Sequence, residues 1–261
     1  MPSAGQGSRD SVDSGRMSRL DPRLLLQGYA TGIFPMADSR DADELFWVEP
    51  RNRAVIPLDR FHVSRSLRRT LRTGPFSITR DHDFTAVIEA CADREETWIN
   101  DELERAMLAL HGSGHAHSIE VWSGELLVGG LYGVKLGRAF FGESMFSRMR
   151  DASKVALAWL VARLKAGNFT LLDCQFMTEH LASLGAISVP RETYVALLSV
   201  ALGAGTGAGG AAAGELVEAL GAVPDAPPDF FALDRLLELA GAAGAGGPGG
   251  YVISQLLGQT S

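Results

Sequence analysis

Apolar residues dominate the stretch from Ser118 to Gln175, and their spacing changes along it. Three runs that mix apolar and polar residues are separated by short turns, SGE at 123–125 and LGR at 136–138. A longer apolar segment follows at 151–167, and a short apolar run at 169–175. Short runs joined by tight turns are typical of antiparallel strands, whereas the longer segment is typical of a helix. The pattern predicts a three-stranded meander, a helix and one more strand that returns to the edge of the meander.

Two groups of polar residues interrupt this apolar stretch. Glu143-Ser144 lies in the third run, and Asp173-Cys174-Gln175 ends the last one. Burying an unpaired carboxylate is unfavourable, so carboxylates in such strands either form pairs or take part in chemistry. Glu143 and Asp173 are therefore the first candidates for a functional site.

The rest of the chain alternates between short helices and short strands. Asp21 is placed to cap a helix that begins at Pro22, because proline is favoured at the first helical position. The run at 46–58 indicates two short strands around a proline-containing turn. The remaining predicted elements are a strand at 76–79, helices at 84–92 and from 101 to 112 or 114, a short helix at 180–184, a strand at 186–189 and a helix at 191–202.

These elements divide the chain into four parts, and the fold class that we expect is α+β. Residues 1–18 are rich in Ser, Gly and Asp and predict a disordered tail. Residues 19–61 predict a small N-terminal α+β domain, and residues 62–202 a mixed-sheet domain. Residues 203–261 are a Gly/Ala-rich extension that contains segments at 215–219, 230–239 and 251–257. The sequence does not say where these three segments lie.

The composition is that of a globular protein with one large core, because 46% of the 261 residues are hydrophobic. No apolar run is long enough to span a membrane, and the polar first residues do not predict secretion, so we expect a cytoplasmic protein. Cys91 and Cys174 lie in apolar patterns and are expected to be reduced. The net charge of −7 argues against general affinity for nucleic acid, although a local basic surface is compatible with it.

One short segment has such a local basic surface. Between Val63 and Thr73 four arginines recur at helical spacing, while Leu67 and Leu71 fall on the opposite face. A basic helix face is often simply solvated. This face contains no carboxylate, however, and guanidinium groups match phosphate oxygens well, so we predict that it binds a phosphate backbone. Its residues are Arg65, Arg68, Arg69 and Arg72.

The predicted order of elements from Ser118 onward is similar to that of acetyl-CoA-dependent N-acetyltransferases. Their acetyl-CoA cleft needs a glycine-rich turn at the start of the helix, where backbone N–H groups reach the pyrophosphate. The corresponding residues 146–154, FSRMRDASK, contain no glycine. An acetyl-CoA enzyme therefore remains an alternative, but the sequence argues against it.

Three histidines, His111, His115 and His117, fall within seven residues and raise the possibility of a metal site. A structural zinc site needs four ligands, and no Cys or Asp stands nearby to complete the set. We therefore predict no metal and no cofactor.

Several blocks of the sequence together carry a more specific resemblance. They are GYATGIFPM at 28–36, TWI at 97–99, GHAHSIEVW at 114–122, LVGGLYGV at 127–134, FGESMFS at 141–147, ASK at 152–154, LDCQ at 172–175 and HLASLGA at 180–186. In this order, over about residues 20–200, they resemble the bacterial leucyl/phenylalanyl-tRNA–protein transferases. The resemblance implies a small N-terminal domain followed by an acetyltransferase-like (GNAT-like) mixed-sheet domain.

The resemblance also implies a reaction. Leu or Phe, and less well Met, moves from aminoacyl-tRNA to the α-amino group of a protein that begins with Arg or Lys, which marks that protein for degradation through the N-end rule. By this resemblance Gln175 orients the acceptor amine, Asp173 polarises Gln175 from behind, and Glu143 holds the acceptor amine or its cationic side chain. The structural alternative is that Asp173 caps the following turn and Glu143 pairs with an arginine.

A donor pocket for Leu or Phe must be apolar and of fitting volume. By resemblance it is lined by seven apolar side chains, and Trp98 stacks on the terminal adenosine of the tRNA. Periodicity alone would assign the leucines to the core, and Trp98 to a buried contact between strand and helix. The seven pocket residues are Leu131, Phe140, Met145, Leu157, Leu160, Leu164 and Leu172.

The sequence departs from the family pattern in one place. Where many members have two consecutive tryptophans, this chain has Trp47-Val48, and an insertion at 38–44 lies beside them. The difference affects the expected contact to the terminal ribose or adenine and the donor preference. We expect a monomer, and a non-catalytic tRNA-binding adaptor remains the second alternative.

Overall fold

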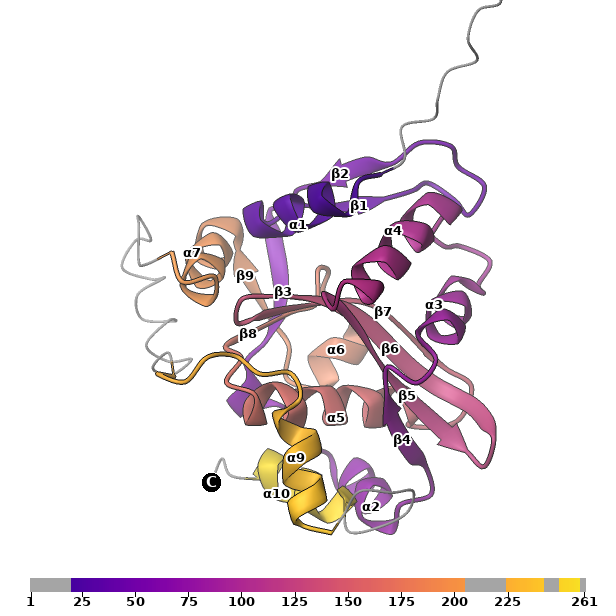
Figure 1. Ribbon diagram of the computed structural model, residues 1–261, viewed down its shortest axis with the longest axis vertical. Coiled ribbons are helices and arrows are strands. Elements are labelled where there is room, and N and C mark those ends of the chain that lie inside the picture. Colours follow the sequence, from indigo (N-terminus) through magenta and orange to yellow (C-terminus); the bar gives the residue numbers. More distant parts are fainter. Residues whose placement is uncertain (1–19, 205–223, 242–248, 259–261) are drawn as a thin grey trace, which may run out of the picture.

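The computed structural model describes residues 20–204, 224–241 and 249–258 (Figure 1). The predicted tail at 1–18 and the segment at 215–219 lie outside the described residues. No helix in the described ranges is long and apolar enough to cross a membrane.

A seven-stranded mixed sheet forms the centre of the molecule, in the order β4-β5-β6-β7-β8-β3-β9. Strands β5, β6 and β7 pair in antiparallel fashion, and the turns that join them lie at 124 and 137. The predicted meander is therefore confirmed. The strand after the following helix, β8, pairs with β7 in parallel. The strands are β3 (Asn52–Ile56), β4 (Ser77–Arg80), β5 (Ala116–Ser123), β6 (Leu126–Leu136), β7 (Ala139–Ser147), β8 (Leu171–Asp173) and β9 (Ile187–Pro190).

Helices cover both faces of this sheet and make two hydrophobic cores. On one face lie α1 (Pro22–Thr31), α3 (Phe84–Ala92), α4 (Asp101–Gly112) and α7 (Arg191–Ala201) (Figure 1). On the other lies α5 (Ala152–Ala166), of whose fifteen residues eleven are buried. A helix that is apolar all round is one that is packed on all sides. Two shorter helices, α2 (Arg65–Thr73) and α6 (Glu179–Ser183), lie beside the same face as α5.

The predicted N-terminal part is built around α1 and a two-stranded sheet of β1 (Phe34–Met36) and β2 (Phe46–Val48). The side chain of Asp21 caps α1 by accepting a hydrogen bond from the N–H of Arg23, and Pro22 begins the helix. The two short strands predicted around the proline-containing turn are confirmed as β2 and β3, but they belong to different sheets: β2 pairs with β1, whereas β3 enters the large sheet between β8 and β9. Three of the last four residues of β3 are apolar, and all four are buried, so this strand is stabilised by the central core.

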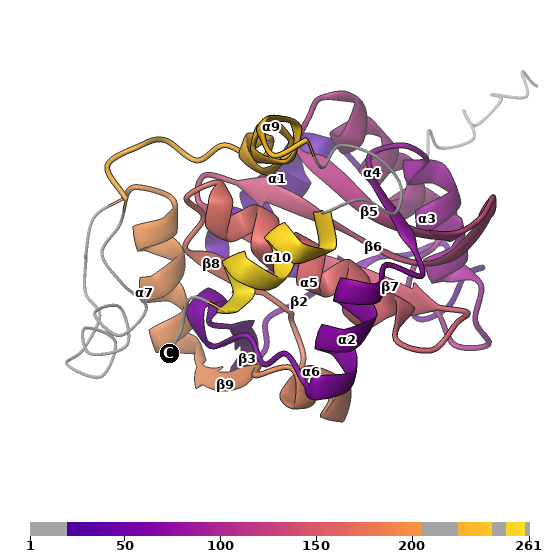
Figure 2. The same cartoon turned by 90° about the horizontal axis from the view of Figure 1, so that it is seen from below.

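The described part of the C-terminal extension contains two helices, α9 (Ala232–Leu239) and α10 (Gly249–Gly258). Both lie on the α5 side of the sheet, and α10 lies next to α2 (Figure 2). The extension thus packs on the body of the protein through both helices. The predicted α+β fold class is confirmed: a small N-terminal part precedes a mixed-sheet domain.

Candidate active site

A cavity of about 250 Å³ lies where β6, β7 and β8 meet α5. Six of the eight residues predicted to bind substrate line it: Trp98, Leu131, Met145, Leu157, Leu160 and Leu172. They come from five segments of the chain, from the loop before α4 to β8. The structure therefore brings together most of the set that the resemblance indicated.

The other two predicted pocket residues, Phe140 and Leu164, are not among the lining residues. Both are fully buried. The ring of Phe140 stacks on Phe230 of the C-terminal extension, with 5.6 Å between centroids. Leu164 lies one turn beyond Leu160 on α5, and belongs to the packed core. These two side chains support the cavity from behind and do not face it.

Strand pairing explains why the polar residues converge at one end of this cavity. In the parallel pair of β7 and β8, Phe141 lies opposite Asp173. The residues two positions further on lie at the same end of the sheet, one in β7 at the irregularity of its pairing with β6 and the other just past the end of β8. Those residues are Glu143 and Gln175, and Nε2 of Gln175 donates a hydrogen bond to Oε1 of Glu143 at 2.9 Å. Both side chains line the cavity.

Gln175 has a constrained backbone, with φ at 60° in the left-handed region. This conformation is uncommon for a residue other than glycine and is held only where its surroundings impose it. Its N–H donates to Oδ1 of Asp173 at 2.8 Å, and its carbonyl accepts from the N–H of Ala54 at 3.0 Å. Asp173 thus contacts the backbone of Gln175, not its side-chain amide, and fixes the turn that presents it.

Asp173 also forms a buried ion pair that the sequence analysis missed. Arg53 of β3 donates from Nε to both carboxylate oxygens, at 2.9 and 3.0 Å, and from Nη2 at 2.6 Å. The hydroxyl of Tyr194 donates to Oδ2 at 2.8 Å. Burial opposes the charge of Arg53, but Asp173 raises the pKa of the guanidinium above its usual value. The sequence feature that could have indicated this ion pair is an arginine near the start of a buried apolar strand.

Glu143 lies in a very different electrostatic environment. It is fully enclosed, and burial raises the pKa of its carboxyl group to about 8. The nearby Tyr29 and Gln175 act in the opposite direction, but they do not offset this effect. Oε2 of Glu143 has no hydrogen-bond partner among the described residues. The carboxyl group is therefore largely protonated near neutral pH, and its Oε2 is buried near the hydroxyl of Tyr29, which also has no hydrogen-bond partner among the described residues.

Several further lining residues were not assigned to the pocket from the sequence. His180 is the most informative, because its Nε2 is buried without a hydrogen-bond partner in the described structure. Burial, and then Lys154, lowers the pKa of this imidazole, so the ring is neutral near pH 7. Their position in the sequence could have indicated them, since most of these residues follow Gln175 within a few positions or lie beside Glu143. The newly assigned set is Arg94, Tyr132, Gly142, Ser144, Cys174, Phe176, Thr178, His180 and Leu181.

The insertion at 38–44 packs against the segment that follows Trp98, although none of its residues lines the cavity. The amide of Asn100 donates to the carbonyl of Ala42 at 2.9 Å, and Nη1 of Arg40 donates to the carbonyl of Ile99 at 3.1 Å. Trp47 lies against Gly28 of α1, where a Cβ atom would come within 2.3 Å of the indole ring. The insertion therefore contacts the segment that carries Trp98.

The three histidines considered as a metal site each have contacts within the protein. Nδ1 of His117 donates a hydrogen bond to Oδ2 of Asp81 at 2.8 Å. His111 has a contact of 2.9 Å between Nδ1 and the carbonyl of Ala116, and it stacks on Phe84. His115 lies 3.2 Å from the hydroxyl of Ser113. None of these contacts brings the three rings to a common point.

The predicted arginine face lies on α2, away from the cavity. Ser64 caps this helix, because its hydroxyl oxygen accepts a hydrogen bond from the N–H of Leu67. All four arginines are exposed, while Leu67 and Leu71 are buried on the opposite side. Among the described residues none of the four forms an ion pair. The face is free for an anionic ligand.

The cavity beside the mixed sheet has the features of an enzyme active site, because an apolar pocket ends at a buried carboxyl group that is hydrogen-bonded to a side-chain amide. Such a site can hold an apolar group next to a reacting polar centre. Sequence comparison gives the family. Residues 55–199 match the leucyl/phenylalanyl-tRNA protein transferase model, and residues 18–51 match the N-terminal domain of the same enzymes. The chain belongs to this family and is a transferase.

Similar proteins agree over most of their length. A leucyl/phenylalanyl-tRNA–protein transferase of Rhizorhabdus wittichii is 57% identical over 250 residues, which cover 94% of this chain and 100% of the relative. One of Novosphingobium aromaticivorans is 50% identical over 272 aligned positions, with the same coverage. One of Cereibacter sphaeroides is 62% identical over 183 residues, covering 70% of this chain and 86% of that protein.

Proposed function

We propose that this transferase moves Leu or Phe, and less well Met, from aminoacyl-tRNA to the α-amino group of a protein that begins with Arg or Lys. The observation that carries the proposal is the cavity itself. Five leucines, Met145 and Trp98 form the apolar part of its walls, and it ends at the Gln175–Glu143 pair. An apolar pocket of this volume selects a branched or aromatic side chain, and the polar end receives the reacting groups.

Glu143 and Gln175 hold the acceptor amine. The amide nitrogen of Gln175 donates to Glu143, so the amide oxygen is left to accept from an amine. Glu143 supplies the negative charge beside that oxygen. Binding a cationic group beside Glu143 favours its carboxylate form, which offsets the raised pKa of the empty site. Asp173 acts as a positioning residue, because it fixes the backbone of Gln175 and is itself fixed by Arg53.

The reaction is aminolysis of an ester. The amine nitrogen attacks the ester carbonyl, a bond from nitrogen to that carbon forms, and the bond from the carbon to the ribose oxygen breaks. A free α-amino group has a pKa of about 7.7–8.0, so it must lose a proton before or during attack. The ammonium form releases this first proton to solvent, and the nitrogen loses a second proton as the amide forms; the second proton passes to the departing ribose oxygen, with the neighbouring 2′-hydroxyl as a carrier. The enzyme contributes mainly by orienting the two reactants.

The tRNA body lies on the arginine face of α2. Arg65, Arg68, Arg69 and Arg72 are exposed and point away from the core, and guanidinium groups suit phosphates. Trp98 lines the cavity at the position where the terminal adenosine would stack. Charged tRNA is a cytoplasmic substrate, so we place the reaction in the cytoplasm. Tagged proteins then enter N-end-rule degradation.

Incubation with charged tRNA and a short peptide tests this proposal. We expect a peptide with N-terminal Arg or Lys to gain the mass of one Leu or Phe residue, measured by mass spectrometry. A matched peptide with N-terminal Glu, and one with an acetylated N-terminal Arg, are the controls and should gain nothing. Glu143→Gln should slow the transfer, because it removes the carboxylate next to the amine.

The same assay separates the alternatives. An acetyl-CoA enzyme would add an acetyl group when acetyl-CoA replaces charged tRNA, and would bind CoA in calorimetry. A tRNA-binding adaptor would bind charged tRNA without any change of peptide mass. Absence of product with every donor, in a sample that is folded, would overturn the proposal.

A further inference from the structure

The arginine helix α2 has little intrinsic stability. It is nine residues long, and helices shorter than about 12–15 residues are marginal in water. Arg65, Arg68, Arg69 and Arg72 repel one another at spacings of three and four residues, and no acidic residue lies in the first turn. Packing of the opposite face must therefore hold the helix in place.

That packing comes to a large extent from α10 of the C-terminal extension (Figure 2). Leu67 and Leu71 of α2 belong to the same buried cluster as Ile253 and Leu257 of α10. The two backbones approach closely at Gly250: a Cβ atom there would lie only 2.0 Å from the carbonyl oxygen of Leu71. A glycine is thus required at this contact.

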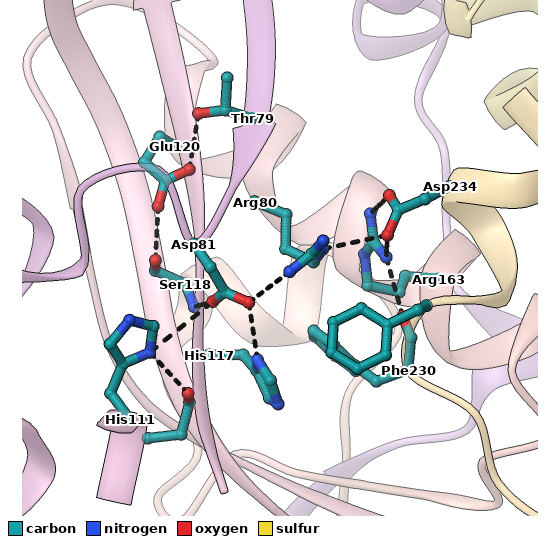
Figure 3. Close-up of polar contacts among 12 residues, drawn as sticks. Thr79, Arg80, Asp81, His111, His117, Ser118, Glu120, Arg163, Phe230 and Asp234 are labelled. Carbon is teal, nitrogen blue, oxygen red and sulfur yellow. Dashed lines mark hydrogen bonds and ion pairs between the residues drawn. The ribbon is translucent and has the colours of Figure 1, made fainter. Parts of the chain in front are cut away.

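The extension is itself anchored to the body through the segment that precedes α10. Phe230, just before α9, is buried against His117 and Phe140. Asp234 of α9 accepts hydrogen bonds from Arg163 of α5 at 2.5 and 2.9 Å, and from Arg80 of β4 at 3.0 Å (Figure 3). The extension therefore connects α5, which lines the cavity, with α2, which carries the arginines.

We propose that α10 is a positioning element for tRNA, which holds the arginine helix in the orientation that contacts the phosphate backbone. The inference rests on the proposed binding of tRNA to α2. The sequence of α10, GGYVISQLLG, contains no charged residue, so α10 acts on tRNA through α2 and not by direct ion pairing. The family model ends at residue 199, so α10 lies outside the region that defines the family.

Two glycines of α10 offer a matched pair of variants. Gly250→Ala places a methyl group against the backbone of Leu71, whereas Gly258→Ala places one where nothing lies within 4 Å. We expect Gly250→Ala to bind charged tRNA roughly tenfold more weakly at 0.15 M salt, with a shallower dependence of log Kd on log salt, because phosphate contacts are lost. Gly258→Ala should match the unaltered protein. Ile253→Ala, which withdraws a buried side chain from the same contact, is the second variant if Gly250→Ala does not fold.

Transfer of Leu from 3′-leucyl-adenosine, a small donor without a tRNA body, tests for a general structural defect. Such a defect would slow this reaction as well. We expect Gly250→Ala to transfer Leu from this donor at the rate of the unaltered protein, because the cavity is untouched. Loss of transfer from both donors would overturn the proposal, since it would mean that α10 supports the whole fold. Unchanged tRNA affinity in a folded Gly250→Ala protein would also overturn it.

The variant Arg68→Glu distinguishes failure of the inference about α10 from failure of the proposal that tRNA binds at α2. Arg105→Glu, at an exposed position on α4, is its control with the same change of net charge. If Arg68→Glu weakens tRNA binding and Gly250→Ala does not, the inference about α10 is wrong and the assignment of α2 stands. If Arg68→Glu has no more effect than Arg105→Glu, tRNA does not bind at α2, and the inference falls with that assignment.

Discussion

Two arginine–aspartate clusters hold different parts of this enzyme together, and they differ in burial. Arg53 and Asp173, beneath the cavity, have side chains that are 1% and 0% exposed. Arg80 and Asp234, where the extension meets the body, are 25% and 30% exposed, and only Arg163, the other partner of Asp234, is buried, with 3% exposed (Figure 3). The deep pair joins two strands that are neighbours in the sheet. The shallow pair joins the body to the extension, and its two residues are 154 positions apart in the sequence.

The difference in burial implies a difference in role. Breaking a buried pair leaves a charge in the core and is strongly destabilising, whereas an exposed pair contributes little. The deep pair is therefore an obligatory part of the fold that presents Gln175. The shallow cluster fixes the orientation of a segment whose attachment comes mainly from apolar contacts, with Phe230 at their centre.

The largest expected effect comes from Asp173→Asn. The new amide would place an N–H₂ group among the donors Arg53, Tyr194 and the N–H of Gln175, and would leave the guanidinium unpaired. We expect the free energy of unfolding to fall by about 3–5 kcal/mol in urea denaturation. Because the turn at Gln175 loses its support, transfer activity should fall as well.

An exposed ion pair of the same chemistry provides the control for this prediction. Glu49 and Arg191 are about half exposed, and Glu49→Gln should change the free energy of unfolding by less than about 1 kcal/mol. If Asp173→Asn changed stability no more than Glu49→Gln, the deep pair would not be the support that its burial indicates.

Phe230→Ala should have the next largest effect. The ring is 2% exposed and lies among His117, Phe140 and Phe169, so its removal leaves a cavity that cannot easily close. We expect a loss of about 3 kcal/mol, seen as faster amide hydrogen exchange in α9. The neighbouring Phe231 is 40% exposed, and Phe231→Ala is the control, with a loss below about 1 kcal/mol. Equal exchange rates in the two variants would contradict this account.

The contrast between the two regions also explains what could be predicted from the sequence. Strands of the meander and the helices at 84–92 and 101–112 follow local signals, such as alternation, caps and glycine turns, and were found within a few residues. Glu143 was a candidate because it interrupts an apolar strand, the role of Gln175 was proposed from resemblance, and the pairing of β7 with β8 brings the two together. Their catalytic roles remain predictions.

The pocket could be predicted only in part, because periodicity cannot identify one face of α5 when the helix is buried on nearly all sides. Leu160 and Leu164 therefore look alike in the sequence, although only Leu160 lines the cavity. A bulge between Tyr132 and Gly133 shifts the register of β6 and β7, so simple alternation does not assign Phe140 to a face either. Such register shifts depend on tertiary packing.

The extension could not be placed from the sequence for a different reason. Its glycine and alanine tracts carry no side chains that specify a partner, and the informative residues are isolated. Asp234 contacts Arg163 and Arg80, which precede it by 71 and 154 residues. No local pattern encodes contacts of that range. The division of the chain into domains at 61 and 202 likewise remains a prediction.

The smallest expected effect is that of Asp234→Asn. Asparagine has the same shape and keeps one acceptor for Arg163, and Arg163 also donates to the carbonyl of Phe230 at 2.8 Å, so we expect a loss of about 1–2 kcal/mol in the opening of α9. Burial would raise the pKa of Asp234, but Arg163 and then Arg80 lower it below its usual 3.8.

A carboxylate with a lowered pKa stabilises the folded state above its unfolded value of 3.8, and this contribution is lost as pH falls through the folded value. The difference between the original protein and Asp234→Asn should therefore be constant near neutral pH and shrink below about pH 4, in hydrogen exchange measured for α9. It should also shrink at 1 M salt, where screening weakens the partly exposed contact to Arg80. A difference as large as that of Phe230→Ala would mean that Asp234, and not the apolar contact at Phe230, holds the extension to the body.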